Sequence, residues 1–125
     1  MGQSPVDRYG RVRLAQLVAS FYADVLRSER LAHYFQHVPM AGLLEHQSMF
    51  MVMVMGGPTA FTPEDIEQVH RHLRISEDDF EEMLRLLEKS LLDYEVTLTD
   101  AAYVVEGYRK LQRHVVSDPP RRDDS

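Results

Sequence analysis

Residues 14–26 have the sequence LAQLVASFYADVL, and this stretch decides the fold class. Its apolar residues recur at intervals of three and four, which places them on one face of an α-helix. Glycine and proline, which interrupt helices, are absent from the stretch. We therefore predict a helix that packs one apolar face against the rest of the chain. That face consists of Leu14, Leu17, Val18, Phe21, Tyr22, Val25 and Leu26.

The chain on either side of this helix is less regular. Residues 1–10 show little periodicity and indicate a lead-in, and residues 31–35 predict one helical turn before Pro39. Residues 41–55 are ambiguous, because their alternating methionines are typical of a buried strand while Leu43, Gln47, Phe50, Met51 and Val54 share one helical face. The length of the segment and the helix propensity of methionine favour a helix, which Gly56-Gly57-Pro58 ends.

Three further helices are predicted by their starting residues and apolar spacing. Thr62-Pro63-Glu64-Asp65 and Ser76-Glu77-Asp78-Asp79 both combine a hydroxyl cap with acids in the first helical turn. A break near residues 95–99 precedes a last helix with Ala101, Val104, Val105, Tyr108 and Leu111 facing inward. We predict a single all-α domain over residues 11–116, followed by a disordered tail at 117–125.

Composition excludes several kinds of protein. The 125 residues include six histidines and no cysteine, so disulfides, thiol catalysis, cysteine-bound metal clusters and thioether-linked haem are all excluded. A formal net charge of −6 argues against non-specific binding to nucleic acid or to an anionic membrane. No apolar run approaches the length that spans a bilayer, and no signal peptide is evident, so a cytoplasmic location is expected.

Three apolar helix faces carry a polar interruption: Tyr22, Gln47 and His70. A buried hydroxyl, amide or imidazole costs free energy unless it finds a partner, so each of these residues needs an explanation. On pattern alone, a histidine or tyrosine in such a place is more often a hydrogen-bonded core residue than a ligand. The methionines are likewise more often flexible core residues, although they also suit a cavity around a non-protein ligand.

Taken in order, the residues resemble the first group of truncated haemoglobins, the short globins with a two-over-two helical sandwich that encloses a haem. Single pieces are weak evidence, but their order and spacing match from about Val12 to Val116. The matching pieces are Phe21-Tyr22, residues 31–35, Met40, Leu43, His46-Gln47, Phe50, Gly56-Gly57-Pro58, Phe61, Val69-His70, Ile75, Phe80 and Val115-Val116.

The resemblance implies a non-covalent haem b with His70 as the proximal iron ligand. It implies that Tyr22 donates a hydrogen bond to bound dioxygen and that Gln47 steadies the tyrosine or the gas. Leu43 stands where larger globins have a distal histidine. The resemblance implies that the cofactor lies among Phe21, Tyr22, Phe35, Leu43, His46, Gln47, Phe50, Met51, Phe61, Val69, His70, Arg74, Ile75 and Phe80.

His46 has two possible roles under this resemblance. In cyanobacterial and algal relatives the side chain at this position binds the iron from the distal side when no gas is present. In other relatives a basic residue there only contacts a haem propionate. Both alternatives stay open for His46 at this point.

The sequence also departs from the family pattern. Tyr9-Gly10 keeps only one of the two glycines that usually precede the first long helix. Arg71 or Arg74 is expected to pair with a propionate. Some cyanobacterial members bond a haem vinyl group to a histidine of the last helix, but His114 falls two residues late, so a covalent link is not expected.

The resemblance implies a protein that reversibly binds O₂, NO and CO, in oxygen binding or transport or in nitric oxide dioxygenation with an unidentified external reductase. The alternative is a six-coordinate redox or gas sensor, or an O₂ store, without a catalytic role. A helical interaction module without haem is a third possibility. We expect a monomer or weak dimer.

Overall fold

The computed structural model describes residues 5–71 and 73–116, and its regular structure is helical. The only β pairing among these residues is an isolated parallel bridge between Ile75 and Val116. The all-α prediction is therefore confirmed, while the predicted tail at 117–125 lies outside the described residues. The helices are α1 (Pro5–Tyr9), α2 (Arg11–Arg27), the 3₁₀ helix η1 (Ala32–Phe35), α3 (Met40–Val54), α4 (Pro63–Arg71), α5 (Glu77–Asp93), α6 (Leu98–Arg109) and α7 (Gln112–Val115).

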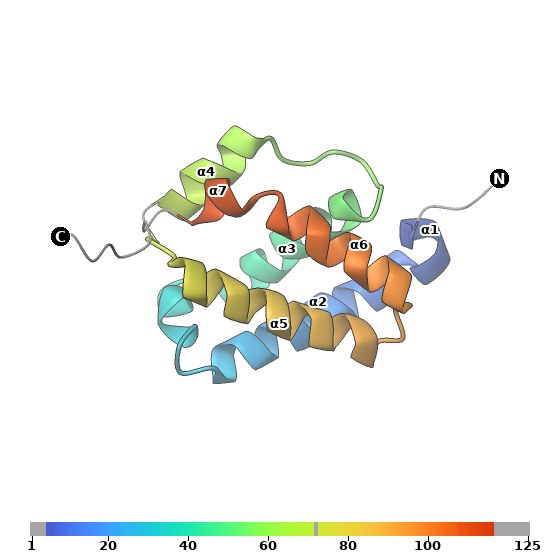
Figure 1. Cartoon of the computed structure of the whole chain (residues 1–125), viewed down its shortest axis with the longest axis horizontal. Coiled ribbons are helices and arrows are strands. Elements are labelled where there is room, and N and C mark those ends of the chain that lie inside the picture. Colours follow the sequence, from blue (N-terminus) through green and yellow to red (C-terminus); the bar gives the residue numbers. More distant parts are fainter. Residues whose placement is uncertain (1–4, 72, 117–125) are drawn as a thin grey trace.

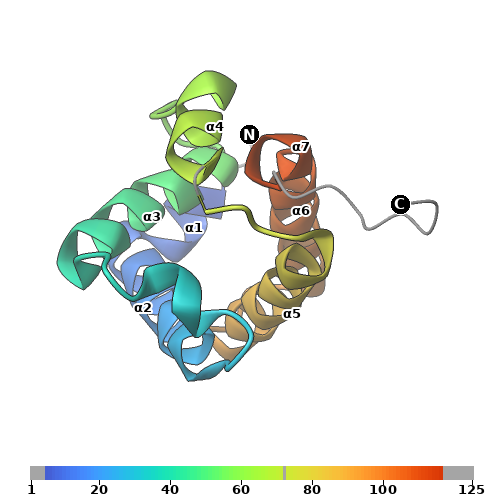
Figure 2. The same ribbon diagram turned by 90° about the vertical axis from the view of Figure 1, so that its left-hand side faces the viewer.

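Two pairs of helices form the body of the molecule. Helices α2 and α3 lie on one side and α5 and α6 on the other, as Figure 2 shows. Helix α2 packs on both α3 and α5, α5 packs on α6, and α3 also contacts α6. Helix α4 lies beside α7, away from α2 (Figure 1). None of the described helices is long and apolar enough to cross a membrane.

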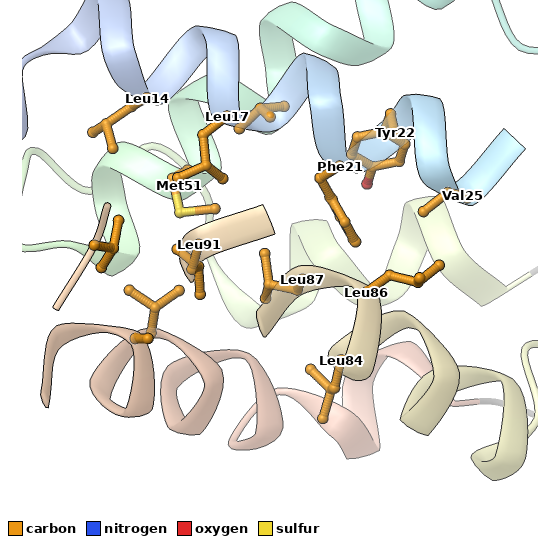
Figure 3. Close-up of a cluster of buried hydrophobic side chains, with 14 of the residues drawn as sticks. Leu14, Leu17, Phe21, Tyr22, Val25, Met51, Leu84, Leu86, Leu87 and Leu91 are labelled. Carbon is orange, nitrogen blue, oxygen red and sulfur yellow. The ribbon is translucent and has the colours of Figure 1, made fainter. Parts of the chain in front are cut away.

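The face of α2 predicted to be apolar forms the centre of the core. Leu14, Leu17 and Val25 are fully buried and face Leu87 and Leu91 of α5 (Figure 3). Burial of each such side chain stabilises the fold by about 1.5–3 kcal/mol relative to an exposed position. The prediction is wrong at one end of the face: Leu26 is 41% exposed, although its neighbour Val25 in the same last turn is fully buried.

Side-chain caps fix the starts of three helices. The Thr62 hydroxyl accepts a hydrogen bond from the Asp65 amide at 3.1 Å, and the Asp65 carboxylate accepts one from the Thr62 amide at 3.0 Å. Ser76 caps α5 in the same way by accepting from the Asp79 amide. Thr97 caps α6, which sets the end of the predicted break. The helix starts predicted at residues 62 and 76 are thus confirmed.

The methionine-rich segment is helical and ends at its two glycines. The Gly56 amide donates to the Met53 carbonyl at 3.1 Å, and the Gly57 amide donates to the Val52 carbonyl at 2.8 Å. This pair of bonds is a Schellman motif, which satisfies carbonyls that the helix leaves unpaired. Gly56 has a φ of +99°, a conformation that L side chains rarely adopt.

Both ends of the domain differ in detail from the prediction. Residues 5–9 of the lead-in form α1, and Gly10, with a φ of +83°, turns the chain into α2, so a single glycine suffices. Tyr9 holds α1 against α6 by donating to the Asp100 carboxylate at 2.6 Å. The predicted last helix is interrupted after Arg109 and resumes as α7.

Replacing Gly56 with alanine is expected to lower the free energy of unfolding by about 1–2 kcal/mol, since a Cβ disfavours the left-handed backbone there. Urea denaturation monitored by circular dichroism measures this change. Gly42→Ala is the matched control, because Gly42 lies within α3 and an added Cβ meets no atom within 4 Å. That variant should gain about 0.5–1 kcal/mol. Equal effects of the two substitutions would contradict the assignment of the αL cap to Gly56.

Candidate functional site

His70 lies in the last turn of α4, and its ring is oriented by the backbone of the same helix. The Nδ1 atom is 2.6 Å from the Ile66 carbonyl oxygen, four residues earlier. Because a carbonyl only accepts, Nδ1 carries a proton, and in the neutral imidazole Nε2 then carries the lone pair. A histidine that donates one ring N–H to a backbone carbonyl presents the other nitrogen as a metal ligand.

The apolar stripe of α4 is only partly covered by the rest of the chain. Ile66 is buried and His70 is half-buried, but Val69, which the resemblance places beside the cofactor, is 61% exposed. After α4 the exposed Arg74 adopts a φ of +55°, which is uncommon for a residue other than glycine, and Ile75 returns to the interior. An exposed valine beside an imidazole is therefore available to contact an apolar surface.

Tyr22 projects from α2 into the interior, where aromatic rings hold it. Its ring lies 4.8 Å from that of Phe21 and meets the ring of Phe35 edge-on at 5.6 Å. The side chain is 4% exposed, and its hydroxyl points inward in Figure 3. Burial raises the pKa of Tyr22, so the phenol stays protonated and can donate. No described residue forms a hydrogen bond with this hydroxyl.

An ion pair and a hydrogen bond hold the segment that carries Phe35. The Tyr34 hydroxyl donates to the Asp79 carboxylate at 2.5 Å, and Arg30 Nε lies 3.0 Å from the other oxygen of that carboxylate. Burial, together with the hydrogen bond to Asp79, raises the pKa of Tyr34 to about 12. These contacts attach η1 to the start of α5 and keep Phe35 against Tyr22.

Helix α3 contributes the other predicted distal residues. Phe50 and Met51 are buried, and Leu43 and Gln47 are half-buried. Among the described residues no hydrogen bond joins Gln47 to Tyr22, so the predicted pair is not directly linked. Phe61, which follows α3, is half-buried with its ring 6.3 Å from that of Phe50.

His46 lies at the rim of this group. Its side chain is exposed, and its ring is 6.3 Å from the ring of Phe61 in an edge-on arrangement. Phe80 is buried at the start of α5, and α5 lies across the molecule from α3 (Figure 2). Among residues 5–71 and 73–116, no group of three or more histidine and carboxylate side chains could hold a metal ion.

Two further polar side chains were not predicted as part of the site. Tyr108 of α6 meets Phe50 edge-on at 4.9 Å, and burial raises its pKa well above the usual value. His114 of α7 has a buried Nδ1 atom without a hydrogen-bond partner. Tyr108 could have been found from sequence, because it interrupts the apolar face of its helix as Tyr22 does. The environment of His114 depends on how α7 packs against α4, which local sequence does not determine.

The residues present fit a haem. His70 can offer an Nε2 lone pair, the buried Tyr22 phenol has no acceptor among the described residues, and α2, α3 and α5 contribute buried aromatic and aliphatic side chains. A planar apolar macrocycle with a ligated iron would give the Tyr22 hydroxyl a partner and cover the exposed Val69. We find no side chain in the described site that conflicts with this use.

Comparisons with known proteins agree with this chemistry. A family model described as bacterial-like globin matches residues 8–117. A group 1 truncated hemoglobin from Tetrahymena thermophila is 27% identical over 104 residues, which cover 81% of this chain and 86% of that protein. A group 1 truncated hemoglobin from Synechocystis is 32% identical over 56 residues, 45% of each chain.

Solved structures share the fold. The truncated hemoglobin from Tetrahymena pyriformis in its Fe(III) form gives a TM-score of 0.82 at 21% identity and covers 91% of this chain and 98% of that chain. The 2/2 hemoglobin from Synechococcus, in the cyanomet state and with covalently attached heme, gives a TM-score of 0.84 at 23% identity with the same coverage.

Proposed function

Because the chain belongs to the bacterial-like globin family as a group I truncated haemoglobin, we propose that it binds dioxygen at a haem b and converts nitric oxide to nitrate there. A bound haem supplies an iron centre that takes up O₂, NO or CO and exchanges single electrons. Side chains of this protein are proposed to hold the haem, bind the dioxygen and exclude water. O₂ storage and O₂ transport are served by the same binding step.

The observation that carries the proposal is the hydrogen bond from His70 Nδ1 to the Ile66 carbonyl. This contact inside α4 orients the ring and, in the neutral imidazole, places the lone pair on Nε2, which is the proposed iron-binding nitrogen. His70 is the proposed proximal ligand. Val69, exposed one residue earlier, is proposed to pack on the macrocycle, and Arg71 or Arg74 is proposed to pair with a propionate.

Tyr22 is proposed to donate a hydrogen bond to dioxygen on the side of the cofactor away from His70. Its raised pKa keeps the phenol protonated at any physiological pH, and its lack of a described acceptor leaves the hydroxyl proton available for the gas. The rings of Phe21 and Phe35 fix the phenol and exclude water from it. Gln47, half-buried on α3, is proposed to supply a second polar group.

The proposed reaction joins one O₂, one NO and one electron to give nitrate. It transfers no proton, so no side chain needs to act as acid or base. An external reductase supplies the electron, and the residues of this chain bind O₂ and exclude water. A gas sensor that works through exchange of His46 is the alternative, but the exposed position of His46 favours a rim contact over ligation of the iron.

Apoprotein titrated with haemin should develop a Soret band that saturates at one haem per chain. His70→Ala should lower haem affinity at least about tenfold, as removal of a ligand or its support does in metal sites, and added imidazole should restore the parent spectrum. His37→Ala is the matched control, because His37 is exposed and outside the site. A parent spectrum in His70→Ala without imidazole would contradict proximal ligation.

Oxygenated protein mixed with NO should convert to the ferric form within the mixing time of a stopped-flow instrument and release one nitrate per haem. Tyr22→Phe should lose dioxygen at least about tenfold faster, because a hydrogen bond to a polarised ligand contributes about 1.5–3 kcal/mol. Tyr103→Phe, at a 57% exposed position, serves as control. Slow oxidation without nitrate would overturn the dioxygenase proposal and leave O₂ storage.

The ferric spectrum should be the same in His46→Ala as in the parent protein, since an exposed rim histidine leaves the iron's coordination unchanged. Visible absorption and electron paramagnetic resonance of both proteins at neutral pH measure this. A change from a six-coordinate low-spin to a high-spin spectrum on substitution would instead identify His46 as a distal ligand and favour the sensor.

A further inference from the structure

The short helix η1 carries Phe35, the ring that meets Tyr22 edge-on with centroids 5.6 Å apart, yet burial alone does not hold this helix. None of its four residues, all of which the structure describes, is fully buried, and its main packing partner is α2. A segment without a fully buried side chain gains little stability from the hydrophobic effect and detaches at a low free energy. Polar contacts must therefore contribute to the position of Phe35.

Two donors near η1 reach the same carboxylate on α5. The Tyr34 hydroxyl donates to Asp79 Oδ2 at 2.5 Å, and Arg30 Nε lies 3.0 Å from Asp79 Oδ1. The Asp79 side chain is 14% exposed, so its charge is partly shielded from water and its hydrogen bonds are stronger than those of a surface carboxylate. The pKa of Tyr34, raised to about 12, keeps the phenol protonated as the donor. We call these three side chains the Asp79 clasp.

The acceptor end of the clasp is firmly attached to the fold. The Asp79 amide donates to Ser76 Oγ at 3.1 Å, which is the cap of α5, and the next residue, Phe80, is buried. Asp79 is thus fixed in the first turn of α5. Because Tyr34 and Phe35 are consecutive residues of η1, a bond that fixes the first residue also restricts the second.

A similar bond elsewhere in the molecule provides a comparison. The Tyr9 hydroxyl donates to the Asp100 carboxylate at 2.6 Å, and Arg8 also pairs with that carboxylate, at 2.7 Å. This group ties α1 to α6 at the start of α2, whereas Tyr22 lies about three helical turns further along α2. The two phenol–carboxylate bonds are therefore alike in chemistry and differ in their distance along α2 from the proposed gas-binding residue.

Resting on the proposed function, we propose that Tyr34 and Asp79 are positioning residues for dioxygen binding. Their hydrogen bond, supported by Arg30, holds Phe35 against the Tyr22 ring, so that the Tyr22 hydroxyl keeps one orientation toward the gas. Neither residue touches dioxygen. Loss of the clasp releases η1 and weakens one of the two ring contacts described for Tyr22, which lets the phenol take up more than one orientation.

The test compares Tyr34→Phe with Tyr9→Phe in haem-loaded protein. Tyr34→Phe keeps the ring and removes the donor, and we expect it to speed O₂ dissociation about twofold to tenfold, the range that corresponds to loss of one aromatic edge contact. The C–O stretching band of its CO complex should broaden or split, because the distal donor then has several orientations. Tyr9→Phe, the matched control, should lower the melting temperature to a similar extent and leave dissociation and the CO band unchanged.

Two further measurements examine the route through Phe35. The Val38 amide donates to the Phe35 carbonyl at 3.3 Å, and its hydrogen exchange should be faster in Tyr34→Phe than in the parent protein or in Tyr9→Phe. This measurement does not depend on gas binding. In a Tyr22→Phe background, Tyr34→Phe should leave O₂ dissociation unchanged, because the group that it positions is absent.

The outcomes separate this inference from the proposed function. If the parent protein takes up no haem, both fail. If it binds O₂ but forms no nitrate from NO, the proposed dioxygenation alone fails. If Tyr34→Phe matches Tyr9→Phe in O₂ dissociation and in the CO band, this inference alone is overturned. An equal effect of Tyr34→Phe with and without the Tyr22 hydroxyl would also overturn it, because the clasp would then act independently of Tyr22.

Discussion

The buried face of α2 is the constraint on which the rest of the structure depends. Leu14, Leu17 and Val25 are fully enclosed by α3 and α5, which fixes the rotation of α2 about its own axis. Tyr22 lies on the same face, so its hydroxyl is carried inward by the packing of its neighbours. The Tyr22 hydroxyl is thus placed inside the protein without any special backbone conformation. Its position follows from helical periodicity and from the apolar residues that surround it.

Those parts of the fold that rest on local interactions could be predicted from the sequence. Apolar spacing located the main helices, and the hydroxyl caps at Thr62 and Ser76 located two of their starts, because a cap involves residues only three apart. The hydrophobic pattern of the methionine-rich segment fitted both a strand and a helix. Its length and the helix propensity of methionine correctly favoured a helix. Tyr22 and His70 could be singled out because a polar residue on an apolar face is visible in sequence.

What could not be predicted depends on contacts between distant segments. Val69 has the spacing of a core residue, yet it is 61% exposed. The left-handed backbone of Arg74 arises where the chain turns from α4 toward the buried Ile75, and arginine itself gives no indication of it. The contact between Tyr108 and Phe50 requires α6 to approach α3 at a glycine, and the sequence alone does not say which helix that glycine will face.

The separate position of α4 has a consequence for how the molecule opens. Helices α2, α3, α5 and α6 share one buried core, whereas α4 packs mainly on α7. Helix α4 itself contributes one buried side chain, Ile66. The chain that follows α4 is held by the bridge between Ile75 and Val116. Regions with few buried apolar contacts detach at a lower free energy than global unfolding. By this argument, the helix that carries His70 is expected to detach from the four-helix core before that core unfolds. We therefore expect the amide hydrogens of α4 to exchange with solvent sooner than those of α2.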